Sequence, residues 1–147
     1  HALRLTHRAG FSYASDCRPA QILTAAAVGE IVACPQLPST LPTLDEILML
    51  EPGCSPDQAA DRILQLSSAI VGDHVFTLRA ELEGMKFCSA FERLLGGWKS
   101  KDYQLVALRE IHATLDMHQL PLHVVRFAEV PGRAGPRMMQ GEAFLQD

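Results

Sequence analysis

The stretch "HVFTLRAELEGMKF", residues 74–87, decides which fold is expected. In a strand, successive side chains along its first ten residues would point to opposite faces, and one of these faces would be apolar from Phe76 to Leu82. One face would carry Phe76, Leu78, Ala80 and Leu82, and the other Val75, Thr77, Arg79, Glu81 and Glu83. The second face turns polar only toward its C-terminal end. The pattern predicts a strand over 74–80 that ends in a charged cluster; a strand running out into a solvated polar loop remains an open alternative.

Strand and helix patterns alternate along the rest of the chain. Gly10 should end a helix over 2–9, and capping patterns at Thr43 and at Ser55–Pro56 should each begin another. Further strands are expected over 11–15, 30–34, 103–108 and 122–130, further helices over 86–101 and 109–117, and a Gly/Pro-rich tail over 131–147. This alternation predicts an α/β protein with mostly parallel strands, either an open doubly wound sheet or part of a barrel.

Composition excludes several classes of function. The 147 residues, 48% of them hydrophobic, predict one domain with a core. A net charge of −4 with scattered Lys and Arg argues against nucleic acid as a partner, and no apolar run is long enough for a membrane span. The four cysteines form no C-x-x-C pair, so reduced thiols in a cytoplasmic protein are expected. The six histidines form no metal-binding unit, so we expect no metal ligands in this chain.

A second segment, "YASDCR" (13–18), also ends an apolar stretch with charge, at Asp16 and Arg18. A simple turn, with Asp16 bonding to nearby backbone, is the alternative. Because the carboxyl ends of parallel strands meet at one edge, we expect Asp16, Arg18, Arg79, Glu81 and Glu83 to open onto a common polar pocket.

Four segments in this order resemble the C-terminal part of the NodB-homology polysaccharide deacetylases: "YASDCR", "LPSTLPTLDEIL", "HVFTLRAELEGM" and "GRAG". The similarity is strongest to the branch that deformylates lipid-linked 4-deoxy-4-formamido-L-arabinose. The resemblance implies about half of a distorted (β/α) barrel. It also implies a divalent metal such as zinc, held in the family by residues that are absent here.

The resemblance assigns roles to two residues. Asp16 matches an aspartate that orients a general-acid histidine, and Arg79 stands where that histidine belongs, since the family pattern is Leu-His-Ala-Glu and this chain has Leu-Arg-Ala-Glu. A guanidinium cannot donate its proton near neutral pH, and losing a general acid costs about 10²–10⁴-fold in rate. We therefore expect Arg79 to pair with Asp16, and the chain by itself to be inactive.

Three functions follow from these expectations. The first is a carbohydrate deacetylase or deformylase completed by an N-terminal half, acting on an N-acylated or lipid-linked sugar at the cytoplasmic or inner-membrane face. The second is a truncated, non-catalytic homologue that covers its exposed edge as a homodimer. The third is a sugar-phosphate or lipid-phosphate binding module that uses Arg18, Arg79 and Arg133.

Overall fold

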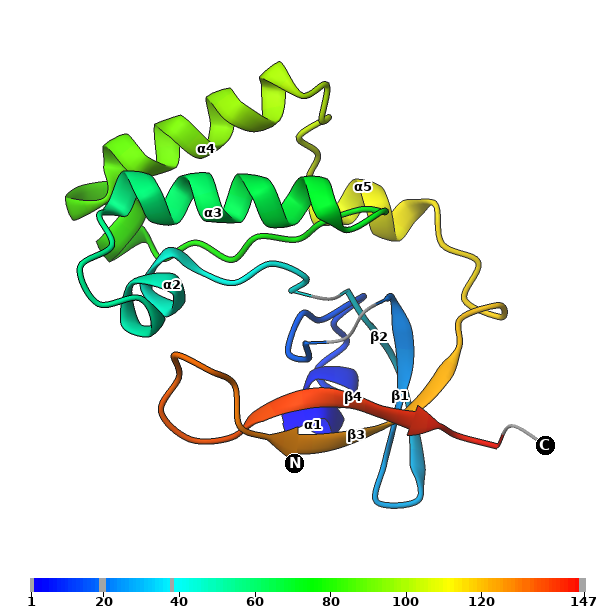
Figure 1. Ribbon diagram of the computed structural model, residues 1–147. Coiled ribbons are helices and arrows are strands. Elements are labelled where there is room, and N and C mark those ends of the chain that lie inside the picture. The colour runs from blue at the N-terminus through cyan, green and yellow to red at the C-terminus, as the bar shows by residue number, and fades with distance from the viewer. Residues whose placement is uncertain (1, 19–20, 38, 146–147) are drawn as a thin grey trace. The chain divides into compact units, whose positions relative to one another are not determined.

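A computed structural model describes residues 2–18, 21–37 and 39–145, which form two compact units (Figure 1). The sheet unit comprises His1–Thr40, Val106–Glu129 and Gly135–Asp147, and the helical unit comprises Leu41–Leu105 and Val130–Ala134. The fold is mixed α/β, as predicted. The barrel and the single domain stay predictions.

Four strands build the sheet unit: β1 (Leu23–Ala27), β2 (Glu30–Gln36), β3 (Leu122–Ala128) and β4 (Arg137–Ala143). Their order is β2-β1-β3-β4. The pairs β1–β2 and β3–β4 are antiparallel, and only β1–β3 is parallel. The expectation of mostly parallel strands is therefore wrong. The connections within the two antiparallel pairs are too short for the crossover of a dozen or more residues that a parallel pair needs.

The expected strand over 11–15 is replaced by a segment that bonds to both outer strands of the sheet. Ala14 pairs with Gln36 of β2, and Arg18 pairs with Met139 of β4, each as an isolated parallel bridge. The supporting backbone bonds include Ala14 N–H to the Pro35 carbonyl and Arg18 N–H to the Met138 carbonyl, both 2.9 Å. This segment holds Asp16 between two fixed points.

A small apolar core lies against the sheet. Helix α1 (Ala2–Arg8) ends before Gly10, as predicted, and inserts Leu3 into this core. The other buried members are Cys17, Leu23, Ala25, Val32 and Cys34. The second helix of the unit is α5 (Leu108–Ala113), which confirms the expected helix but is shorter than 109–117 at its C-terminal end. Residues 103–107, expected as a strand, have no strand conformation.

The helical unit contains α2 (Leu44–Leu50), α3 (Pro56–Ala69), the π-helical turn η1 (Leu82–Lys86) and α4 (Cys88–Ser100). Both predicted capping sites are confirmed, since α2 starts after Thr43 and α3 starts at Pro56 after Ser55. In Figure 1, α3 and α4 run alongside each other. Their facing sides supply a buried core that includes Ile63, Leu94 and Trp98.

Helix α4 packs within the helical unit. Phe87, Leu94 and Trp98 are buried in one cluster with residues of α2 and α3, and Phe91 packs at its margin. Helix α3 supplies the apolar face on which these side chains pack.

The stretch of residues 74–87 is not a strand. Residues 74–79 belong to no strand of the structure, and a helix begins at Ala80 and continues through η1. The two-residue alternation of the sequence therefore does not decide which of these side chains are buried. As a result Leu78 is 47% exposed, while Glu83 is only 1% exposed, the reverse of the predicted faces.

Candidate functional site

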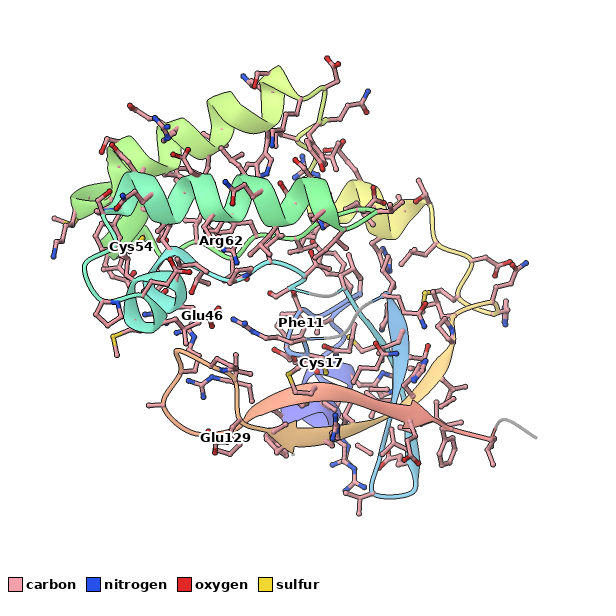
Figure 2. All side chains as sticks on the ribbon, viewed as in Figure 1. Phe11, Cys17, Glu46, Cys54, Arg62 and Glu129 are labelled. Carbon is pink, nitrogen blue, oxygen red and sulfur yellow. The ribbon has the colours of Figure 1, made fainter. Side chains whose placement is uncertain are left out.

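The beginning of α2 holds a buried carboxylate, Glu46, which is 1% exposed (Figure 2). Its Oε2 accepts a hydrogen bond from the Thr43 backbone N–H at 3.0 Å, the reciprocal half of the predicted capping pattern. Its Oε1 accepts one from Arg133 Nε at 2.5 Å. Burying a charged carboxylate is costly unless it is paired and hydrogen-bonded, and both conditions hold here.

Arg133 is the second member of this cluster. Its side chain is 14% exposed, and besides Glu46 it bonds to the Thr43 hydroxyl at 3.3 Å and lies 3.4 Å from Asp45 Oδ2. The preceding residue, Gly132, makes this approach possible. A Cβ there would lie 2.6 Å from the Glu46 carbonyl oxygen, and the φ of +77° favours glycine. Arg133 thus fastens its loop to α2.

Arg79 completes the cluster from another segment of the helical unit. Its Nη1 lies 3.1 Å from Asp45 Oδ2, the same oxygen that Arg133 approaches. The Thr43 hydroxyl donates to Asp45 Oδ1 at 2.6 Å and fixes the other side of the carboxylate. Arg79 is 36% exposed, more than Asp45 at 22% or Arg133 at 14%. A chain of polar contacts therefore runs from the buried Glu46 outward to the guanidinium of Arg79.

Glu83 lies close to this cluster. Its Oε2 accepts the Arg79 backbone N–H at 2.6 Å, and its Oε1 has no hydrogen-bond partner among the described residues. Burial raises the pKa of Glu83, and the charges of Asp45 and Glu81 raise it further. Glu81 itself is exposed. The pocket role assigned to these two glutamates stays a prediction, but Glu83 is a buried carboxyl group.

Asp16 and Arg18 belong to the sheet unit. The Asp16 backbone N–H donates to Gln36 Oε1 at 3.0 Å, and its exposed side chain lies close enough to influence two thiols. Burial raises the pKa of Cys17 to about 12, with a smaller contribution from Asp16, and the pKa of Cys34 rises for the same two reasons. These thiols are buried and unreactive in character.

The structure contradicts one assumption on which the expected pocket was based. Asp16 and Arg79 were expected at the ends of neighbouring parallel strands, but neither residue lies in a strand of the described structure. The anionic partner that the structure gives Arg79 is Asp45, which comes from the same unit. A pairing with Asp16 stays a prediction. Asp45 and Glu46 were missed as site residues because their position at a helix start already explained them.

The described residues supply no metal site. No group of three or more His, Cys, Asp or Glu side chains in residues 2–18, 21–37 and 39–145 could hold a metal ion. The residues therefore do not fit the divalent metal that the resemblance implies. In the same part of the chain, none of the helices combines the length and the apolar character needed to cross a membrane.

No model of a known protein family matches the chain. Curated proteins do match it, among them two named as probable 4-deoxy-4-formamido-L-arabinose-phosphoundecaprenol deformylases. The protein from Wigglesworthia glossinidia brevipalpis is 27% identical over 131 residues, and the one from Shewanella sediminis is 31% identical over 135 residues. The chain is similar in sequence to both proteins along most of its own length. The predicted resemblance is confirmed, and the match lies in the C-terminal part of the relatives. It covers 89% and 90% of this chain but only 45% and 41% of theirs, so the chain spans less than half their length.

Proposed function

We propose that this chain is the C-terminal part of a carbohydrate amide hydrolase that removes a formyl or acyl group from an N-acyl sugar. The observation that carries the proposal is the match along nine-tenths of the chain to two proteins named as deformylases. Their names describe a sugar linked through phosphate to a long polyprenol, so we propose a lipid-linked amino sugar as the substrate class. The remaining part of a distorted (β/α) barrel, with any metal ligands, would lie outside the described residues.

Deformylation consumes one water molecule. The C–N bond breaks, the formyl carbon leaves as formate, and the nitrogen gains a proton as it leaves as an amine. Arg79 is ill suited to supply that proton, because a guanidinium stays charged near neutral pH. It can instead stabilise negative charge or hold a phosphate oxygen, and its exposed fraction of 36% leaves it accessible. We therefore propose that the chain alone does not deformylate.

A non-catalytic role is the second candidate, and one observation favours it. Arg79 is held by Asp45 within a fixed ion-pair cluster, so the position that the resemblance gives to a general acid carries a structural contact here. Arg133, which the phosphate-binding alternative would use, is already bonded to Glu46. A protein that keeps the fold but does not catalyse deformylation could use both arginines for these structural contacts. A homodimer and a cytoplasmic location stay predictions for either candidate.

A chimera tests the proposed function. The matching C-terminal part of the Shewanella sediminis deformylase is replaced by this chain, either unchanged or with Arg79→His, and formate release from the lipid-linked formamido sugar is measured. We expect the Arg79→His chimera to exceed the unchanged one by about 10²–10⁴-fold, the contribution of a positioned general acid. A matched Arg93→His chimera should show no gain, since Arg93 is an exposed residue paired with Asp61. Two chimeras that release formate at the same measurable rate would remove the assignment of position 79. Two folded chimeras that release none would favour the non-catalytic candidate.

A further inference from the structure

We infer that Asp45 is a positioning residue for the side chain at position 79: its carboxylate fixes where that side chain points and favours positive charge there. The inference concerns the cluster of Asp45, Arg79, Arg133, Thr43 and Glu46. Its relevance to a reaction rests on the proposed function, but the geometry does not.

The carboxylate of Asp45 is held on both oxygens. Oδ1 accepts the Thr43 hydroxyl at 2.6 Å, and Oδ2 faces Arg133 Nη1 at 3.4 Å. Neither of these partners can move easily, because both are tied to the buried Glu46, Thr43 by its backbone N–H and Arg133 by its Nε. Asp45 therefore has a defined place before Arg79 is considered.

Arg79 is the outermost member of the cluster. Its guanidinium meets Asp45 Oδ2 at 3.1 Å, and its backbone is fixed separately, because its N–H donates to Glu83 Oε2 at 2.6 Å. A side chain held at both its backbone and its tip keeps one orientation, which is the condition for a group that must act at a defined point. A long, half-exposed arginine without such contacts would sample many rotamers.

The net effect of the surroundings on charge at position 79 can be reasoned from the groups around it. Asp45 and Glu46 come from α2, Glu81 and Glu83 from the helix that begins at Ala80, and Arg133 from the loop 130–134. Arg133 is matched by Glu46, its 2.5 Å partner. Glu83 contacts the backbone of Arg79, whereas Asp45 is the carboxylate that the structure pairs with its guanidinium.

A histidine placed at position 79 serves as a spectroscopic probe of this field. In Arg79→His the imidazole is shorter than the arginine it replaces, but a carboxylate within about 4–6 Å still favours the imidazolium. We expect its NMR titration to fall at a higher pH than the ordinary histidine value of about 6.5. Adding Asp45→Asn should return the titration toward that value, and the matched addition of Asp16→Asn should leave it raised.

A second readout does not depend on a variant at Asp45. Coupling between two titrating groups is reciprocal, so in Arg79→His the carboxyl carbon of Asp45 should show a small chemical-shift step at the titration point of the new histidine. The carboxyl carbon of Asp16 should show none. A titration that responds to Asp16→Asn, or a step at Asp16 in place of Asp45, would overturn the inference and support the pairing expected from the sequence. Because these readouts need no catalysis, they can succeed or fail independently of formate release.

Discussion

Replacing Gly132 with alanine should destabilise the helical unit far more than the same change at Gly135. Both glycines have positive φ, +77° and +72°, so each alanine pays about 1–2 kcal/mol for the left-handed conformation. The two sites differ in space. Nothing lies within 4 Å of a Cβ at Gly135, whereas a Cβ at Gly132 would meet the Glu46 carbonyl oxygen at 2.6 Å and the Glu46 Cα at 3.1 Å. Gly135→Ala is therefore a matched control for backbone strain.

The contact at Gly132 involves helix backbone, so the loop must retreat from α2. Arg133, the next residue, then loses its 2.5 Å bond to Glu46, which is 1% exposed. Leaving a buried charge without its partner costs about 3–5 kcal/mol. A partial retreat forfeits only part of this, and we expect Gly132→Ala to cost about 2 kcal/mol more than Gly135→Ala.

Urea unfolding followed by the fluorescence of Trp98 measures this difference where it occurs. Trp98 is the single tryptophan of the chain and lies in the core of the helical unit. With a slope of about 1–3 kcal/mol per molar urea, 2 kcal/mol separates the two midpoints by about 1 M. A double variant sharpens the test. If the Cβ contact at Gly132 acts by breaking the Arg133–Glu46 pair, Gly132→Ala should destabilise a protein that already carries Arg133→Leu by little more than the backbone strain. Coincident midpoints for the two alanine variants would refute the close packing of this loop on α2.

Three further outcomes are expected. Val28→Asn should raise the unfolding free energy by about 1 kcal/mol in thermal denaturation, and Val28→Thr should not, because Val28 and Gly29 have φ of 53° and 73° and form a two-residue turn that favours Asn-Gly. The pKa of Glu83 is raised in the folded protein, so the unfolding free energy should fall as pH rises from the ordinary glutamate pKa through the raised pKa of Glu83. Urea unfolding measured across this pH range should show that Glu83→Gln lacks this fall. Iodoacetamide at pH 8, followed by mass spectrometry, should modify the exposed Cys88 well before Cys17, whose thiol is buried with a pKa of about 12; equal rates would contradict that burial.

Local signals in the sequence predicted the local structure well. The starts of α2 and α3 follow from Thr43, Ser55 and Pro56, because a cap and a first-turn proline act on groups only three or four residues away. The strand over 30–34 was also correct, although β2 continues past Pro35 to Gln36. β2 is an outer strand of the sheet, where a missing N–H is tolerated.

Signals that depend on distant partners misled the prediction. The alternation over 74–80 is real in the sequence, but a helix that begins at Ala80 cuts it short. Strand β1 was missed because "LTAAA" does not alternate, and its turn carries Val28 where asparagine is usual. Strand β4 was read as tail because glycine and proline around it mark turns, while its pairing with β3 is a long-range choice.

The partner of Arg79 shows why the candidate site was harder to predict than the fold. Asp45 lies 34 positions earlier in the sequence, counted as 79 − 45, and an acidic pair at a helix start is explained without any distant contact. The free-energy cost of burying Glu46 determines how the cluster is arranged. That carboxylate requires a cation, Arg133 supplies it, and the fixed Arg133 in turn holds Asp45 at the place where Arg79 meets it. Since Arg133 is committed to this buried pair, Arg79 is the more exposed guanidinium of the cluster, and any anion-binding role of the cluster should be sought first at position 79.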